Sequence, residues 1–181
     1  EAILVNNRLL DNALVAIGVR NGSRITAEKN TLSRKGGMPP LIAILENSQA
    51  ILSDNDLKGG GVAGVLLQGT AEIRNNRFHG NGPRKGGPPN FAIWVREGSE
   101  ITFSGNQVKG WRHALFASKA KRVTANDNQV RAFLGTALVI RDSEKPATAT
   151  GNRAFSDDPK AQAIEITGPT AEVIGNRVEK N

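Results

Sequence analysis

The stretch Ile-Thr-Phe-Ser-Gly-Asn-Gln-Val at residues 101–108 decides the fold, because its pattern returns along the whole chain. An asparagine followed two positions later by an apolar residue occurs in eight copies. The eight asparagines are Asn7, Asn30, Asn55, Asn76, Asn106, Asn128, Asn152 and Asn176. Successive copies are 21 to 30 residues apart, with a mean near 24. A period of this length is typical of a solenoid of stacked repeats.

The residues before each of these asparagines alternate with the two-residue period of a β-strand that buries one face. The positions five and three residues before the asparagine are apolar in every copy, from Ala2 and Leu4 to Ala171 and Val173. A second apolar strand is expected upstream, at residues 16–20, 43–45, 64–68, 92–96, 114–118, 137–141 and 163–167. Each repeat is therefore predicted to hold a strand, a turn, a strand, an asparagine corner and a short third strand.

The asparagines themselves have a physical role in such a stack. Stacked strands lie about 4.8 Å apart, so each asparagine of the pattern would lie above another. An amide group both donates and accepts hydrogen bonds. A column of amides can therefore bond from rung to rung, as asparagine ladders do in stacked sheets.

This pattern resembles the right-handed parallel β-helix family of the pectate-lyase type over residues 2–180. The resemblance implies an all-β, single-stranded, right-handed solenoid of about eight rungs, forming one domain over residues 1–181. It also implies a bacterial protein that is extracellular, periplasmic or on the cell surface. A leucine-rich repeat is the competing interpretation, and the lack of its longer leucine pattern counts against it. Neither end resembles a polar capping unit, so we expect a part of a longer repeat protein, whose other rungs could carry catalysis.

Composition excludes several classes of protein. The chain has 24 Lys plus Arg against 17 Asp plus Glu, a formal net charge of +7, and no cysteine. Without cysteine it is neither a disulfide scaffold nor a cysteine-ligated zinc module. No apolar run approaches the roughly 20 residues that span a bilayer, so we expect no membrane insertion.

The family's enzymes place acidic and basic residues on the outward face of one strand per rung. The outward residues of this chain therefore indicate whether it has a catalytic site of that kind. The predicted outward column is Gly18, Leu45, Leu66, Trp94, Phe116, Val139 and Glu165, and the next is Arg20, Gln68, Arg96, Ser118, Arg141 and Thr167. Only Glu165 is acidic, so neither paired catalytic carboxylates nor a calcium site can be assembled there. His79 and His113, which could approach each other on adjacent rungs, make a poor metal site without acids or cysteines.

We therefore expect no catalytic residues, no metal and no cofactor. The alternative is a polysaccharide lyase, hydrolase or epimerase that recruits Arg96, Arg141, His113 or Lys109.

Two features favour a binding or structural role instead. The first is an apolar stripe formed by Leu45, Leu66, Trp94, Phe116 and Val139, beside the outward Arg96 and Arg141. Five apolar residues on neighbouring rungs form a patch of the kind that marks a binding or packing surface. Trp94 and Phe116, one rung apart, are suited to a sugar ring or to an apolar partner face.

The second feature is a basic edge on the loops that follow the third strand. The motif Arg34-Lys35-Gly36-Gly37 returns as Arg84-Lys85-Gly86-Gly87, two rungs later. The predicted edge consists of Arg34, Lys35, Lys58, Arg84, Lys85, Lys109, Arg112 and Arg131. A basic edge of this size attracts polyanions.

From these features we expect a non-catalytic scaffold that binds an anionic polysaccharide or a protein surface. Self-association through uncapped ends or through the apolar stripe is a further expectation. Nucleic acid is disfavoured, because no recognised binding module is present and few aromatics are available for base stacking.

Overall fold

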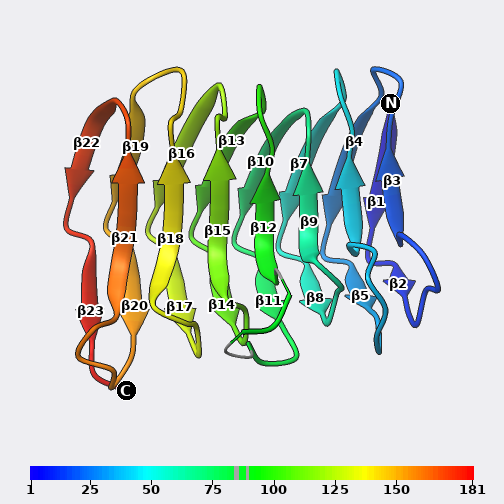
Figure 1. Ribbon diagram of the computed structural model, residues 1–181. Coiled ribbons are helices and arrows are strands. Elements are labelled where there is room, and N and C mark those ends of the chain that lie inside the picture. The colour runs from blue at the N-terminus through cyan, green and yellow to red at the C-terminus, as the bar shows by residue number, and fades with distance from the viewer. Residues whose placement is uncertain (84–85, 89) are drawn as a thin grey trace.

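The computed structural model describes residues 1–83, 86–88 and 90–181, and in these residues the chain forms strands and no helix. The strands assemble three parallel sheets that wind into a β-solenoid, with the two chain termini at opposite ends (Figure 1). Two sheets have eight strands and the third has seven. The predicted all-β solenoid of about eight rungs is therefore confirmed, and the eighth rung contributes strands β22 and β23.

The three sheets follow one another in each rung. Sheet A contains β1 (Ala2–Val5), β4 (Arg24–Glu28), β7 (Gln49–Ser53), β10 (Thr70–Arg74), β13 (Glu100–Ser104), β16 (Arg122–Asn126), β19 (Ala147–Thr150) and β22 (Thr170–Ile174). Sheet B contains β2 (Arg8–Leu9), β5 (Thr31–Ser33), β8 (Asp56–Lys58), β11 (Arg77–His79), β14 (Gln107–Lys109), β17 (Gln129–Arg131), β20 (Arg153–Phe155) and β23 (Arg177–Glu179). Sheet C contains β3 (Ile17–Val19), β6 (Ile42–Ile44), β9 (Ala63–Leu67), β12 (Phe91–Val95), β15 (His113–Ser118), β18 (Thr136–Arg141) and β21 (Gln162–Thr167).

The core lies between the sheets and is built from columns of like residues. In sheet A, Leu52, Ile73 and Phe103 occupy the same position on successive rungs, and each is fully buried. In sheet B, the apolar residue two positions after each asparagine also points inward, as Phe78 does. The alternation seen in the sequence therefore sorts inward from outward side chains in both sheets.

The asparagine corner joins sheet A to sheet B. The residue before each ladder asparagine has a φ between 55 and 69°, and these residues are Asn6, Lys29, Asp54, Asn75, Gly105, Asp127, Gly151 and Gly175. This left-handed conformation is one that glycine, asparagine and aspartate adopt most readily. A single residue in this region thus turns the chain between two strands.

The ladder asparagines that follow are hydrogen-bonded from rung to rung. Asn106 illustrates the pattern: its Nδ2 donates to Asn128 Oδ1 at 3.0 Å, and its Oδ1 accepts from the backbone N and the Nδ2 of Asn76 at 2.9 and 3.1 Å. Asn106 Nδ2 also donates to the Ile73 carbonyl at 2.9 Å. The six inner ladder residues, Asn30 through Asn152, are at most 1% exposed. The predicted ladder is thus present as a buried column.

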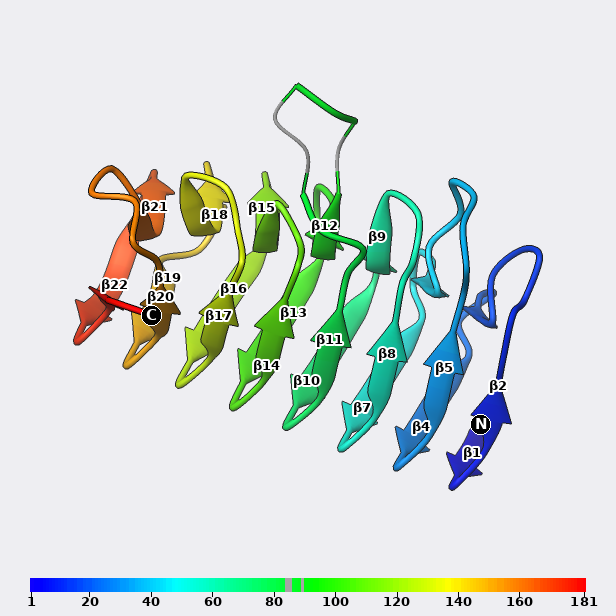
Figure 2. The ribbon, with the colours of Figure 1, turned by 90° about the horizontal axis from the view of Figure 1, so that it is seen from below.

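The loops between sheet B and sheet C vary most in length. In the loop between β11 and β12, the described residues 86–88 lie farther from the solenoid than the loops of neighbouring rungs do (Figure 2). Two glycine-rich loops and the shorter loop between them line an open hollow of about 400 Å³, at Gly37, Gly61, Gly82, Asn81 and Asn90 among others. Gly61 has no space for a side chain, because a Cβ there would lie 1.9 Å from the Met38 carbonyl oxygen.

Candidate binding site

The outward column of sheet C contains Gly18, Ala43, Leu66, Trp94, Phe116, Val139 and Glu165. The structure corrects the position of Leu45, because Ala43 occupies the place predicted for it. Leu45 follows the end of β6, and its backbone N donates to the Val19 carbonyl at 2.8 Å, beside Arg20. The prediction was wrong by two residues, and a shift of two preserves the alternation, so the pattern alone could not detect it.

The apolar stripe is shorter than the sequence suggests. Leu66, Trp94 and Phe116 are half-buried, whereas Val139 is 1% exposed and Ala43 is 8% exposed. The accessible apolar surface of this column therefore consists of three side chains on the strands β9, β12 and β15.

An aromatic cluster surrounds the middle of that stripe. Phe91 stacks on Phe116 with ring centroids 4.7 Å apart and an interplanar angle of 9°. Trp94 meets Phe91 edge-on at 5.6 Å, and His113 stacks on Phe91 at 5.4 Å. Phe91 thus lies between the two rings that were expected to form a platform, and it holds both in place.

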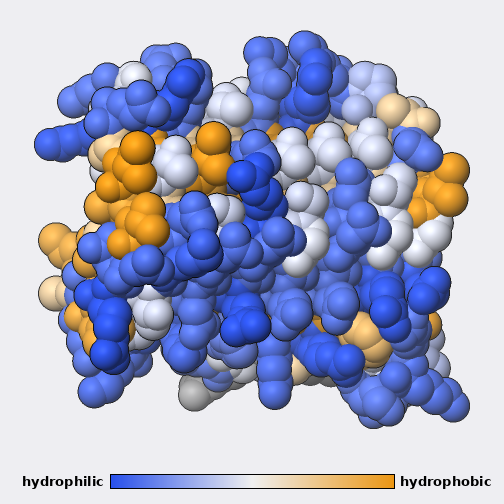
Figure 3. Space-filling model, turned by 180° about the vertical axis from the view of Figure 1, so that it is seen from behind, coloured by the Kyte–Doolittle hydropathy of each residue, from blue (hydrophilic) through white to orange (hydrophobic). Residues whose placement is uncertain are grey.

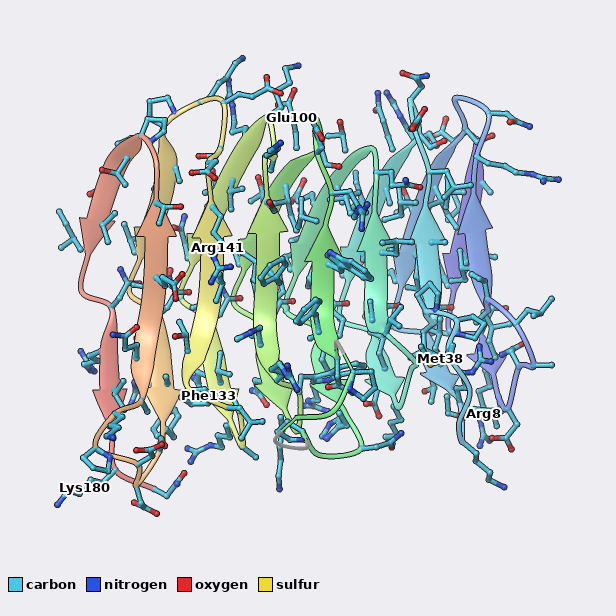
Figure 4. The ribbon with its side chains drawn as sticks, viewed as in Figure 1. Arg8, Met38, Glu100, Phe133, Arg141 and Lys180 are labelled. Atoms are coloured by element: carbon cyan, nitrogen blue, oxygen red, sulfur yellow. The ribbon has the colours of Figure 1, made fainter. Side chains whose placement is uncertain are left out.

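Two arginines cover the rings. The Arg96 guanidinium lies over Trp94 at 4.9 Å from the ring centroid, and Arg141 lies over Phe116 at 5.7 Å. Arg141 projects from β18 on the face turned toward the viewer in Figure 4, and its Nη2 is 2.9 Å from Glu165 Oε1. Such cation–π contacts keep guanidinium groups at the ring surface, where they can meet an anionic group of a ligand.

An open hollow of about 280 Å³ adjoins these rings. It is lined by Trp94, Val95, Arg96, Glu97, Phe116, Ser118 and Lys119. Its walls therefore combine two aromatic rings with two cations and one carboxylate. Such a lining offers both apolar and charged groups to a small ligand.

The surroundings of His113 favour its uncharged form. Burial lowers the pKa of its imidazole below the ordinary value, and the charges of Arg112 and Arg141 act in the same direction. Its Nδ1 is 2.6 Å from the Thr136 carbonyl oxygen, which can only accept, so Nδ1 carries the proton. His113 therefore acts here as a flat ring held in a fixed orientation.

Glu97 and Glu165 are widely separated, whereas Asp142, just beyond β18, lies nearer to Glu165: its Oδ1 accepts from Thr167 Oγ1 at 3.2 Å, on the same strand as Glu165. Glu97 follows β12 and Glu165 lies on β21, three strands away, which corresponds to about 14 Å along the solenoid. Paired carboxylates in glycoside hydrolysis are roughly 5 to 10 Å apart. Among the described residues, no group of three or more His, Cys, Asp or Glu side chains could hold a metal ion.

The predicted basic edge is divided between separate surroundings. Arg34 is 7% exposed and donates to the carbonyls of Ala13, Leu14 and Gly36, so it fastens two loops together and does not face solvent. Lys35 is exposed beside Asp11, with Nζ and Oδ2 3.6 Å apart. Arg112 donates to the Gly87 carbonyl at 2.7 Å. Arg84 and Lys85 lie outside the described residues.

The remaining members of that edge do share a column. Lys58, Lys109 and Arg131 occupy the same position on sheet B, with His79 between Lys58 and Lys109. His79 and His113 therefore belong to different sheets: His79 Nε2 lies 3.7 Å from Asp56 Oδ1, and His113 stacks on Phe91.

Phe91 and Glu97 are residues of the sheet C face that sequence reasoning missed. A signal for Phe91 exists, because Phe91 and His113 each directly precede an alanine followed by an inward aliphatic residue, in Ala92-Ile93 and Ala114-Leu115. Glu97 gave no such signal, since it lies in the turn beyond the alternating pattern.

Comparisons with known proteins identify a family. The sequence model of a family described as "Right handed beta helix region" matches residues 1–108 and, in an overlapping match, residues 41–181. No curated protein and no solved structure matches the chain. In the part of the chain that the structure describes, there is no helix long and apolar enough to cross a membrane.

Proposed function

Since the chain belongs to the right-handed β-helix family, we propose that it is a non-catalytic scaffold whose sheet C face binds carbohydrate that carries an acidic group. The fold supports this proposal because a parallel solenoid holds outward side chains of successive rungs in register. A ligand that lies across the rungs then meets side chains fixed by the backbone.

One observation carries the proposal: Arg96 and Lys119 line one hollow together with the half-exposed Trp94 and Phe116 rings, and Arg141 lies over Phe116. Aromatic faces pack against the apolar face of a sugar ring, and guanidinium groups pair with carboxylate or sulfate. The stack of Phe91 on Phe116 fixes one of the rings in advance, which lowers the ordering cost of binding.

A binding role is favoured over catalysis by the surroundings of Glu97 and Glu165. Glu165 is held by Arg141, and Glu97 is too far from it for the two to act on one glycosidic bond. His113 has its Nδ1 proton engaged by a carbonyl, so only its Nε2 is left as a base. A protein with this role would act outside the cytoplasm, at the cell surface, in the periplasm or in the medium.

The test is a glycan array that contains neutral, uronate, sulfated and sialylated glycans, probed with the wild type and with Trp94→Ala. We expect binding to acidic glycans, weakened about tenfold or more in Trp94→Ala, which is about 1.4 kcal/mol. The matched control is Ile51→Ala, which removes a half-buried aliphatic side chain from the outer face of sheet A. This control should bind like the wild type.

Two results would overturn the proposal. Turnover of pectate, alginate or a sulfated glycan that is lost in Arg96→Ala would establish an enzyme. A change in sedimentation mass in Trp94→Ala, with glycan binding unaffected, would show that the rings pack against another protein chain instead.

A further inference from the structure

The outward face of sheet B presents two columns of polar side chains along the solenoid. One column contains Asp56, Arg77, Gln107 and Gln129, and the other contains Lys58, His79, Lys109 and Arg131. In each of the strands β11, β14 and β17 the first and third residues are exposed and the middle one is buried. Figure 3 shows the molecule from the side opposite Figure 1, with largely hydrophilic residues over the middle rungs.

The charges of these columns are not balanced across the rungs. Arg77 and Lys109 are exposed and have no ion-pair partner among the described residues, while Lys58 is paired with Asp56 at 2.8 Å. Like charges on neighbouring strands repel, and about 4.8 Å is well within the screening length of about 8 Å at physiological ionic strength.

On the last two rungs of sheet B, Arg153 lies opposite Arg177, and Glu179 is ion-paired with both of them, with Arg153 at 2.8 Å. A diagonal pair on sheet C shows the same compensation, because Arg141 pairs with Glu165 on the next rung at 2.9 Å. Lys109 and Arg131 also lie opposite each other, but no carboxylate among the described residues is ion-paired with either of them. A bound anion would relieve the repulsion between them.

The amides beside the cations add a second chemistry. Residues 106–109 have the sequence Asn-Gln-Val-Lys and residues 128–131 have Asn-Gln-Val-Arg, on adjacent rungs. Gln107 and Gln129 are exposed, and their side chains have no hydrogen-bond partner among the described residues. Each of these rungs thus offers one free amide and one cation on the same face.

We propose that this face of sheet B is a second binding surface, which takes an anionic polysaccharide laid parallel to the solenoid axis. Lys109 and Arg131 pair with carboxylate or sulfate groups of the chain, and Gln107 and Gln129 hydrogen-bond its hydroxyl groups. Lys58 to Arg131 spans three rung steps, about 14 Å, which is enough for several sugar units. The surface is separate from the sheet C site and does not depend on it.

A polysaccharide fits better than a nucleic acid. Binding of single-stranded nucleic acid relies on exposed aromatic rings for base stacking. The ring in this column, Phe155, is 7% exposed and lies under the Arg131 guanidinium, 3.7 Å from the ring centroid. The side-chain amides of Gln107 and Gln129 can hydrogen-bond the hydroxyl groups of a sugar chain.

The experiment measures affinity for immobilised dextran sulfate and for alginate, a polyuronate, over a range of salt concentrations. The variant is Lys109→Gln combined with Arg131→Gln. Its control is Arg20→Gln combined with Lys145→Gln, two exposed cations in the turns between sheet C and sheet A, which lowers the net charge by the same amount. A second variant, Gln107→Ala with Gln129→Ala, tests the amides. Circular dichroism verifies that each protein is folded.

We expect the Lys109/Arg131 variant to bind at least one of the two polymers about tenfold more weakly, with a salt slope reduced by about 2 because two counterion-releasing contacts are lost. The Gln107/Gln129 variant should bind severalfold more weakly with an unchanged slope. In a Trp94→Ala background, which removes the proposed sheet C site, the Lys109/Arg131 substitutions should still weaken polymer binding about tenfold, and this separates the sheet B surface from that site. Equal weakening in the control pair would show a diffuse charge effect and overturn the proposal. If the protein bound duplex DNA as tightly as these polymers, and the Lys109/Arg131 variant lost the same affinity for it, polysaccharide would be the wrong ligand class.

Discussion

Replacing Asn106 by alanine removes one amide from the middle of the buried ladder. The Asn106 side chain accepts hydrogen bonds from the backbone N and Nδ2 of Asn76, and donates to Asn128 and to the Ile73 carbonyl. Asn76 Nδ2 has two further acceptors, the carbonyls of Leu52 and Arg74. The group left without an acceptor is therefore the backbone N–H of Asn76, in a residue that is 0% exposed.

The expected cost follows from that single orphaned group. A buried donor that loses its acceptor costs about 1–3 kcal/mol. For a protein of 150–250 residues each kcal/mol lowers the midpoint of thermal unfolding by about 2–4 °C. Asn106→Ala should therefore unfold about 2–12 °C below the wild type.

The same substitution at the end of the ladder provides the control. Asn7 is exposed, and in the described residues its Oδ1 accepts no hydrogen bond, so Asn7→Ala orphans no buried donor. Its effect should stay within about 0.5 kcal/mol. Thermal unfolding followed by circular dichroism at 218 nm, about the usual minimum of β-sheet, compares the three proteins. Equal midpoints for Asn106→Ala and Asn7→Ala would refute the idea that the buried ladder stabilises the solenoid.

Three other substitutions test the packing and the charges. Phe78→Ala empties a fully buried site and should cost about 3–5 kcal/mol in urea unfolding; a cost below 1 kcal/mol would contradict the packed core. Gly61→Ala should lower the thermal midpoint, because the added Cβ meets the Met38 backbone at 1.9 Å; an unchanged midpoint would show that the loops yield freely. Arg153 and Arg177 hold the pKa of Glu179 at about 2, below its ordinary 4.5, so its stabilising effect is present above pH 4.5 and is lost as the pH falls toward 2. Glu179→Gln should therefore lose less stability than the wild type between pH 7 and pH 2, and an identical loss would show that the pairing is not stabilising.

The solenoid and its ladder could be predicted from sequence because each rung repeats the same constraint. Eight asparagines at one spacing, each preceded by alternating apolar residues, allow few other arrangements. The outward face is less constrained, because alternation is unchanged by a shift of two residues, and for this reason the position of Leu45 was predicted wrongly by two residues. Arg34 was expected to be exposed for a related reason: loop composition does not reveal that carbonyls of a neighbouring loop surround its guanidinium. Phe91 and Phe116 lie on neighbouring rungs, and the contact between their rings corresponds to no repeating pattern in the sequence.

The measurement that tests the proposed function most directly is tryptophan fluorescence during titration with acidic trisaccharides, one uronate, one sulfated and one sialylated. Trp94 is half-exposed beside the proposed sugar site, and Trp111 is 1% exposed, so a bound sugar should change the emission of Trp94 alone. A saturable change with at least one trisaccharide, abolished in Trp94→Phe and weakened in Arg96→Gln, is the predicted result. Emission that stays constant with all three trisaccharides, or that changes equally in Trp94→Phe, would contradict a carbohydrate site on sheet C.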